Sequence, residues 1–158
     1  MSNKILLLGL GNELRSDDGV GIAVVREVLK RLSKEDGIDV KESPEMGMAL
    51  LDYLIGYDDV VLVDSIQTGK VPPGSLHELE EKNLLVLHGA SPHYVGISEV
   101  LALGRAIPLH MPERVKIFAI EVSDPFTIST EISSAVSESI PSTASRVIQY
   151  LEEISREV

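Results

Sequence analysis

Residues 4–11, KILLLGLG, form a continuous apolar run that glycines close. A run without polar alternation is typical of a strand buried on both faces, as found inside parallel sheets. The overlapping stretch GLGNELRSDDGVG, residues 9–21, then leads into apolar residues at helical spacing from Val20 onward. A buried strand, a glycine-rich turn and a helix in this order predict the first unit of an α/β fold.

The rest of the chain repeats this alternation of strands and helices. Further strands are predicted at 38–42, 59–64, 74–80 and 114–122, and further helices over 46–54, over 92–106 and in the last third of the chain. Pro141 interrupts the C-terminal helical pattern and predicts a break or kink there. The alternation predicts an α/β fold with a mostly parallel, twisted sheet and helices on both of its faces.

Length, charge and composition exclude several classes of protein. The 158 residues suit a single domain over 1–158. With 25 acidic and 14 basic residues the net charge is −11, which repels nucleic acid phosphates. Because there is no cysteine, any metal must be held by oxygen and nitrogen atoms. No apolar stretch is long enough to cross a bilayer, so we expect no membrane insertion and a cytoplasmic location.

The glycine-rich turn also raises the alternative of a nucleotide-binding module without catalytic activity. Gly9 and Gly11 fit the first two positions of the dinucleotide fingerprint G-x-G-x-x-G, but Leu14 stands at its last position. Asp17 and Asp18 beside the helix start disfavour a phosphate group there. No lysine follows the glycines as a P-loop requires, so this alternative is the weaker one.

Acidic side chains stand at the carboxyl ends of two predicted strands. Asp17 and Asp18 follow Ser16 at the start of the first helix, and Asp64 ends DVVLVD. Open α/β sheets bind ligands outside the carboxyl ends of their strands, which makes these carboxylates candidate ligands. These residues also have ordinary structural explanations. Ser16 can cap the helix, and the helix dipole stabilises Asp17 and Asp18 in its first turn. Asp64, at the end of a strand, can cap a turn.

A histidine completes a possible metal-binding set. His93, in HGASPHYVG, lies just inside a predicted helix start, where its structural alternative is to cap or pack. Two carboxylates and one imidazole suit a divalent cation such as nickel or zinc and leave coordination positions for water or substrate. A metal-dependent hydrolase of small molecules would use such a set. His88 would at most contact one of the metal-binding residues without binding the metal itself, and His77 and His110 are weaker candidates.

Taken together and in order, LGLGNELRSDDGVG, VLVDS and SPHYVG resemble the hydrogenase maturation endopeptidases. These nickel-dependent proteases trim the C-terminal extension of the large subunit of [NiFe] hydrogenases. The resemblance implies a three-layer α/β/α sandwich, a nickel-loaded large-subunit precursor as partner, and Asp18, Asp64 and His93 as the metal-contacting and catalytic residues. The family often has glutamate where this chain has Asp18, which shortens the reach by one methylene. Zinc or cadmium is expected to substitute for nickel in vitro.

Two mechanisms fit this set. In the first, a cation bound by the protease polarises the scissile carbonyl and activates water. In the second, the nickel belongs to the precursor, the three side chains recognise it there, and a carboxylate acts as general base. The resemblance favours the second mechanism. Asp17 is either an accessory acid or only a helix-start residue, and Gly47 is a candidate for close approach of the substrate backbone.

Overall fold

The computed structural model describes residues 3–33, 37–86 and 96–157. Its elements, in chain order, are β1 (Ile5–Leu10), the 3-10 helix η1 (Ser16–Gly19), α1 (Val20–Arg31), β2 (Ile38–Ser43), η2 (Gly47–Leu50), α2 (Leu51–Leu54), β3 (Asp59–Ile66), β4 (Leu76–Glu80), η3 (Glu81–Val86), α3 (Ile97–Ala106), β5 (Arg114–Glu121) and α4 (Ser134–Ser155). No helix in these described segments is both long and apolar enough to cross a bilayer.

The strands form one mostly parallel sheet in the order β2-β1-β3-β5-β4. β1 pairs in parallel with β2 and β3, and β3 pairs in parallel with β5. β4 is antiparallel to β5 and forms one edge of the sheet. All residues of β1 and β3 are buried, which is the reason for the apolar runs ILLLGL in β1 and VVLV in β3. The predicted sheet is therefore confirmed.

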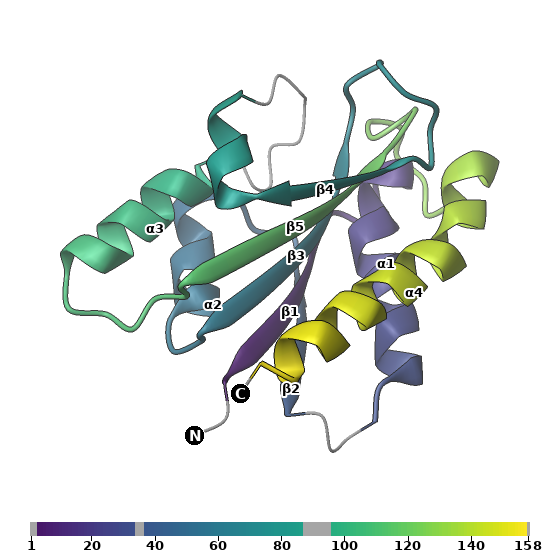
Figure 1. Cartoon of the computed structure of the whole chain (residues 1–158). Coiled ribbons are helices and arrows are strands. Elements are labelled where there is room, and N and C mark those ends of the chain that lie inside the picture. Colours follow the sequence, from purple (N-terminus) through teal and green to yellow (C-terminus); the bar gives the residue numbers. More distant parts are fainter. Residues whose placement is uncertain (1–2, 34–36, 87–95, 158) are drawn as a thin grey trace.

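Helices cover both faces of the sheet, with α2 and α3 on one side and α1 and α4 on the other (Figure 1). Alternate residues of β1 divide between the two layers of core. Leu6, Leu8 and Leu10 pack in the cluster with α2 and α3, whereas Ile5 and Leu7 pack in the cluster with α1 and α4. This arrangement is the three-layer α/β/α sandwich that the family resemblance implies, and it confirms the helices predicted on both faces of the sheet.

Of the break or kink predicted at Pro141, the break is wrong. α4 runs through the proline as one helix of 22 residues. Val136 before the proline and Ala144 and Val147 after it are buried in the same core cluster, while Pro141 itself is exposed. Packing of one apolar stripe on both sides of the proline therefore outweighs the loss of one backbone hydrogen bond.

Two further helix predictions need correction. The segment predicted as a helix over 46–54 is a 3-10 turn followed by the single α-helical turn α2, and Met46 lies before it in extended backbone. Leu29 is one of the apolar residues at helical spacing after Val20, which predicts that it is buried, but it is 56% exposed. The buried stripe of α1 contains Val24, Val25 and Val28, and Leu29 follows one residue, or about 100°, further around the helix.

Candidate functional site

Asp18 lies in η1, directly after the turn that ends β1. The turn is closed by hydrogen bonds from the Arg15 amide to the Asn12 carbonyl and from the Asp18 amide to the Arg15 carbonyl, at 3.1 and 3.0 Å. The Asp18 carboxylate accepts hydrogen bonds from the Asn12 amide, at 2.9 Å, and from the Ser65 hydroxyl, at 3.2 Å. With 5% of its surface exposed, Asp18 is directed from the turn toward β3.

Asp64 lies near the carboxyl end of β3 and is fully buried. Its Oδ1 atom accepts a 2.7 Å hydrogen bond from the amide of Ser65. Ser65 therefore contacts both carboxylates, through its amide and its hydroxyl. Residues 46 positions apart in the sequence thus meet at the carboxyl edge of the sheet, where parallel α/β sheets place their ligands.

The third member of the predicted set, His93, lies outside the described residues, as does His88. Among the residues that the structure describes, no three histidine, aspartate or glutamate side chains form a group that could hold a metal ion. The two remaining histidines have carboxylate partners: His77 lies 3.1 Å from Glu121, and His110 lies 2.8 Å from Asp58.

Asp17, although adjacent to Asp18, faces a different part of the molecule. Its buried carboxylate accepts five hydrogen bonds, from the amide and hydroxyl of Ser123, the amide of Asp124, and the amide and hydroxyl of Ser133. Asp17 therefore holds the loop between β5 and α4. The predicted role of an accessory acid finds no support in these contacts.

The predicted capping role of Ser16 is wrong. Its hydroxyl donates a 2.8 Å hydrogen bond to the carbonyl of Glu131, and no side chain caps the start of α1. Ser16 also has a φ of +48°, an uncommon conformation for a residue other than glycine. Its contact with Glu131 thus joins η1 to the same loop that Asp17 holds.

Sequence reasoning overlooked Glu121, a buried acid at the carboxyl end of β5. Burial alone would raise its pKa, but hydrogen bonds from Thr68, His77 and the Gly69 amide hold the pKa below its ordinary value of 4.5. The Thr68 amide lies 2.8 Å and the Gly69 amide 3.2 Å from Oε2. Glu121 thereby fixes the loop that follows Asp64 and β3. The available sequence signal was an acid one residue before the end of the strand predicted at 114–122.

The glycines of residues 9–21 have packing roles. A β-carbon on Gly9, which suggested a nucleotide, would lie 2.9 Å from the Cγ2 atom of Val25. A β-carbon on Gly21 would lie 2.4 Å from the carbonyl oxygen of Val63, so glycine is needed where α1 crosses the strands. Gly11, with a φ of +149°, would place a β-carbon 2.2 Å from the carbonyl oxygen of Asp18. The Asn12 amide, a donor that a phosphate would use, already donates to Asp18. The geometry therefore gives the nucleotide-binding alternative no support.

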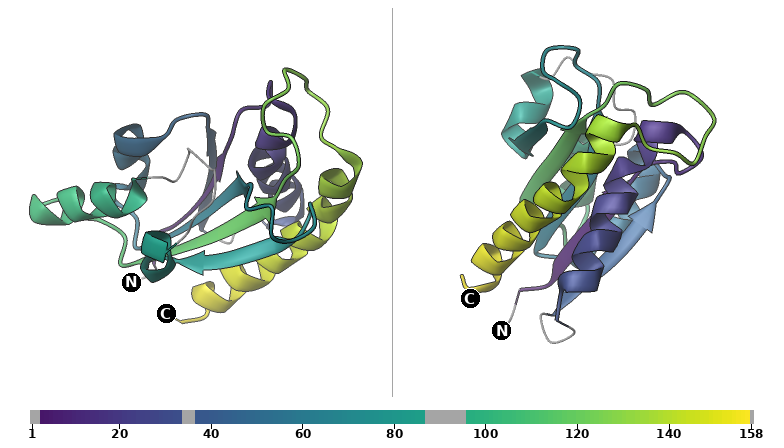
Figure 2. Two further views of the ribbon diagram at one scale, coloured as in Figure 1. Left: turned by 90° about the horizontal axis from the view of Figure 1, so that it is seen from above. Right: turned by 90° about the vertical axis from the view of Figure 1, so that its right-hand side faces the viewer.

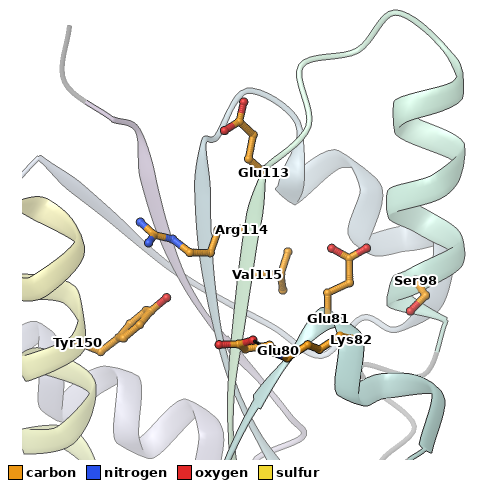
Figure 3. Close-up of a pocket in the computed structure, with 8 residues that line it drawn as sticks. All are labelled: Glu80, Glu81, Lys82, Ser98, Glu113, Arg114, Val115 and Tyr150. Atoms are coloured by element: carbon orange, nitrogen blue, oxygen red, sulfur yellow. Dashed lines mark ion pairs between the residues drawn. The ribbon is translucent and has the colours of Figure 1, made fainter. Parts of the chain in front are cut away.

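A cavity of about 570 Å³ lies elsewhere, at the amino end of β5. Figure 3 shows Arg114, Glu113 and Tyr150 among its lining side chains. Arg114 forms ion pairs with Asp59 and Glu157. Because this cavity is at the opposite end of the parallel strands from Asp64, it is separate from the two carboxylates.

Comparison with known proteins gives a consistent family. A family model described as hydrogenase maturation protease matches residues 22–150. The hydrogenase 2 maturation protease of Escherichia coli strain K12 is 32% identical over 101 residues, which are 63% of this chain and 62% of that protein.

Solved structures of related proteins have the same fold. The hydrogenase maturating endopeptidase HybD from E. coli matches with a TM-score of 0.82 at 24% identity, over 95% of this chain and 93% of that one. The [NiFe] hydrogenase maturation protease HybD from Thermococcus kodakarensis matches with a TM-score of 0.76 at 22% identity, over 94% and 99% of the two chains.

The sequence match to the E. coli hydrogenase 2 protease spans less than two thirds of that protein's length. The family model, in contrast, covers most of this chain, from the start of α1 into α4. Its match agrees with the fold that the solved structures share with this chain. The chain therefore belongs to the hydrogenase maturation protease family.

Proposed function

We propose that this chain is an endopeptidase that removes a short C-terminal peptide from the nickel-loaded precursor of a [NiFe] hydrogenase large subunit, in the cytoplasm. The observation that supports it is the convergence of Asp18 and Asp64 on Ser65. Family membership supplies the class of reaction, and the two carboxylates supply the chemistry that would recognise the metal.

The burial of both carboxylates favours a cationic ligand. Two negative charges that share one serine repel each other, and burial strengthens this repulsion because little water screens it. A divalent cation relieves the repulsion by binding to both groups. Carboxylate oxygens together with an imidazole, here that of His93, suit a borderline cation such as nickel, for which zinc or cadmium would substitute in vitro.

In this proposal the nickel belongs to the substrate. Asp18, Asp64 and His93 would bind nickel that the precursor already carries, so that only a loaded precursor places its C-terminal peptide bond at the protease. One of the carboxylates would then act as the general base for hydrolysis. Nickel recognition thus becomes the condition for cleavage, which prevents processing before the metal is inserted.

Cleavage of matched precursors tests the proposal. Nickel-loaded and nickel-free precursor are incubated with the chain, and the products are measured by mass spectrometry. We expect one short C-terminal peptide from the loaded precursor alone, and no cleavage by Asp64→Asn. The matched control is Asp52→Asn, which changes an exposed aspartate on α2 and should leave cleavage intact. Equal cleavage of both precursors would contradict nickel recognition.

A further inference from the structure

Three large apolar side chains stand exposed on the two loops that meet beside η1. Leu14, Phe126 and Ile128, which we name the apolar rim, are 62%, 68% and 88% exposed. Single exposed apolar residues are common, but a group of them on adjoining segments indicates a binding surface. Leu14 is four residues before Asp18, so the apolar rim lies next to the proposed site.

The two loops are joined by hydrogen bonds, so the apolar rim is held in place. The Ser129 amide donates to the Leu14 carbonyl at 2.9 Å, and the Ser16 amide donates to the Ser129 carbonyl at 2.8 Å. The Phe126 amide donates to the Asp124 carboxylate, also at 2.9 Å. Figure 2 shows this segment between β5 and α4 curving over the start of α1. A surface ordered before binding loses little conformational entropy when a partner docks.

A cavity of about 200 Å³ lies beside the apolar rim, between α1 and the same loop. Its lining combines the apolar side chains of Ile22, Ala23 and Ile132 with polar groups that include Glu13, Arg26 and Thr130. Glu13 directly precedes Leu14, and Thr130 is two residues after Ile128. This placement allows one apolar side chain of a partner to enter the cavity while its neighbours cover the rim.

The charge of this region favours a basic partner. Glu13 and Glu42 both pair with Arg26, which leaves Asp124 and Glu131 as the further acids around the rim and cavity and Arg15 as the further cation. The whole chain has a net charge of −11, so a second copy of the same chain would be repelled. A partner segment with lysine or arginine beside its apolar side chains would be complementary.

We infer that the apolar rim and the adjoining cavity dock a segment of the precursor that presents an apolar side chain flanked by basic residues. This inference rests on the proposed function. Docking at the rim would hold the precursor beside Asp18 independently of the contacts that the nickel makes. The rim therefore contributes to the affinity for the substrate and not to the hydrolysis itself.

Steady-state cleavage of nickel-loaded precursor tests this assignment. The double variant Phe126→Ser, Ile128→Ser should raise KM about tenfold and leave kcat unchanged, because buried apolar anchors dominate the affinity of an interface. The matched control is Ile107→Ser, which changes a residue 44% exposed at the end of α3. Glu131→Lys, an independent variant, should also raise KM and should weaken the dependence of KM on salt concentration.

The outcomes separate the two proposals. If the unchanged chain does not cleave the loaded precursor, the proposed function is overturned and the docking assignment with it. If the unchanged chain cleaves, but the double variant has the same KM as Ile107→Ser, the docking assignment alone is overturned. Circular dichroism and thermal unfolding of each variant establish that the fold is retained, and a rise in KM with unchanged kcat in a folded variant supports docking.

Discussion

The contacts of Asp17 predict that Asp17→Asn destabilises the protein, although the substitution preserves size and shape. The carboxylate accepts hydrogen bonds on both oxygens, from three backbone amides and two hydroxyls. An asparagine side chain has only one acceptor oxygen. Its NH₂ group would replace the second carboxylate oxygen and would face hydrogen-bond donors. At least one buried amide, that of Ser133 or those of Ser123 and Asp124, would then lose its acceptor.

The magnitude follows from these groups. A buried donor without a partner costs about 1–3 kcal/mol, and hydrogen bonds to a charged acceptor are roughly twice as strong as neutral ones. We therefore expect Asp17→Asn to lower the free energy of unfolding by about 2–4 kcal/mol. For a chain of this size, that corresponds to a fall in Tm of about 5–15 °C. Asp52→Asn, on the exposed surface of α2, should change the free energy of unfolding by less than about 0.5 kcal/mol.

Urea unfolding measures the loss, and hydrogen exchange locates it. The amides of Ser123, Asp124 and Ser133 should exchange faster in Asp17→Asn than in the unchanged chain, because their shared acceptor is gone. Amides inside β1 should be affected only through global unfolding. A loss below about 0.5 kcal/mol, or unchanged protection of the Ser133 amide, would refute the assignment of Asp17 as the anchor of this loop.

Three further substitutions test other parts of the structure. Glu121→Gln should lower the free energy of unfolding at neutral pH and make it depend less on pH in acid, as measured by urea unfolding. Hydrogen bonds lower the pKa of Glu121, so its ionised form stabilises the fold at pH values above the ordinary pKa of 4.5. This stabilisation is lost as the pH falls below 4.5 and through the lowered pKa. Gly21→Ala should cost about 3 kcal/mol or more in the same assay, since its β-carbon would meet a strand carbonyl at 2.4 Å. Pro141→Ala should raise the stability by about 1–2 kcal/mol, because alanine restores a helix donor at an exposed position; a loss would show that the proline is needed for α4.

The strands were predictable because local sequence determines them. β1 and the run VVLV of β3 are buried on both faces, so these positions are apolar and no tertiary information is needed to recognise them. The meeting of Asp18 and Asp64 followed from the same strands, since parallel strands end at one edge of the sheet. The helix predictions failed where tertiary packing, and not the local sequence, determines the helix. Pro141 stays inside α4 because side chains on both sides of it share a core, which the proline itself does not reveal.

The difference between Asp17 and Asp18 explains why the site could be predicted only in part. The two residues are adjacent, both are acidic, and both lie in the single turn of η1. Asp18 contacts Ser65, whose position follows from a strand that the sequence identifies. Asp17 contacts residues 106 to 116 positions later, in a loop without periodicity, so no local pattern indicates its partners. The turn thereby gives different roles to two acids that the sequence presents as one pair. Asp17 anchors the loop that contains Phe126 and Ile128 of the apolar rim, and Asp18 lies at the carboxyl edge of the sheet. Loss of the first should weaken docking and stability together, whereas loss of the second should affect cleavage with little change in the loop.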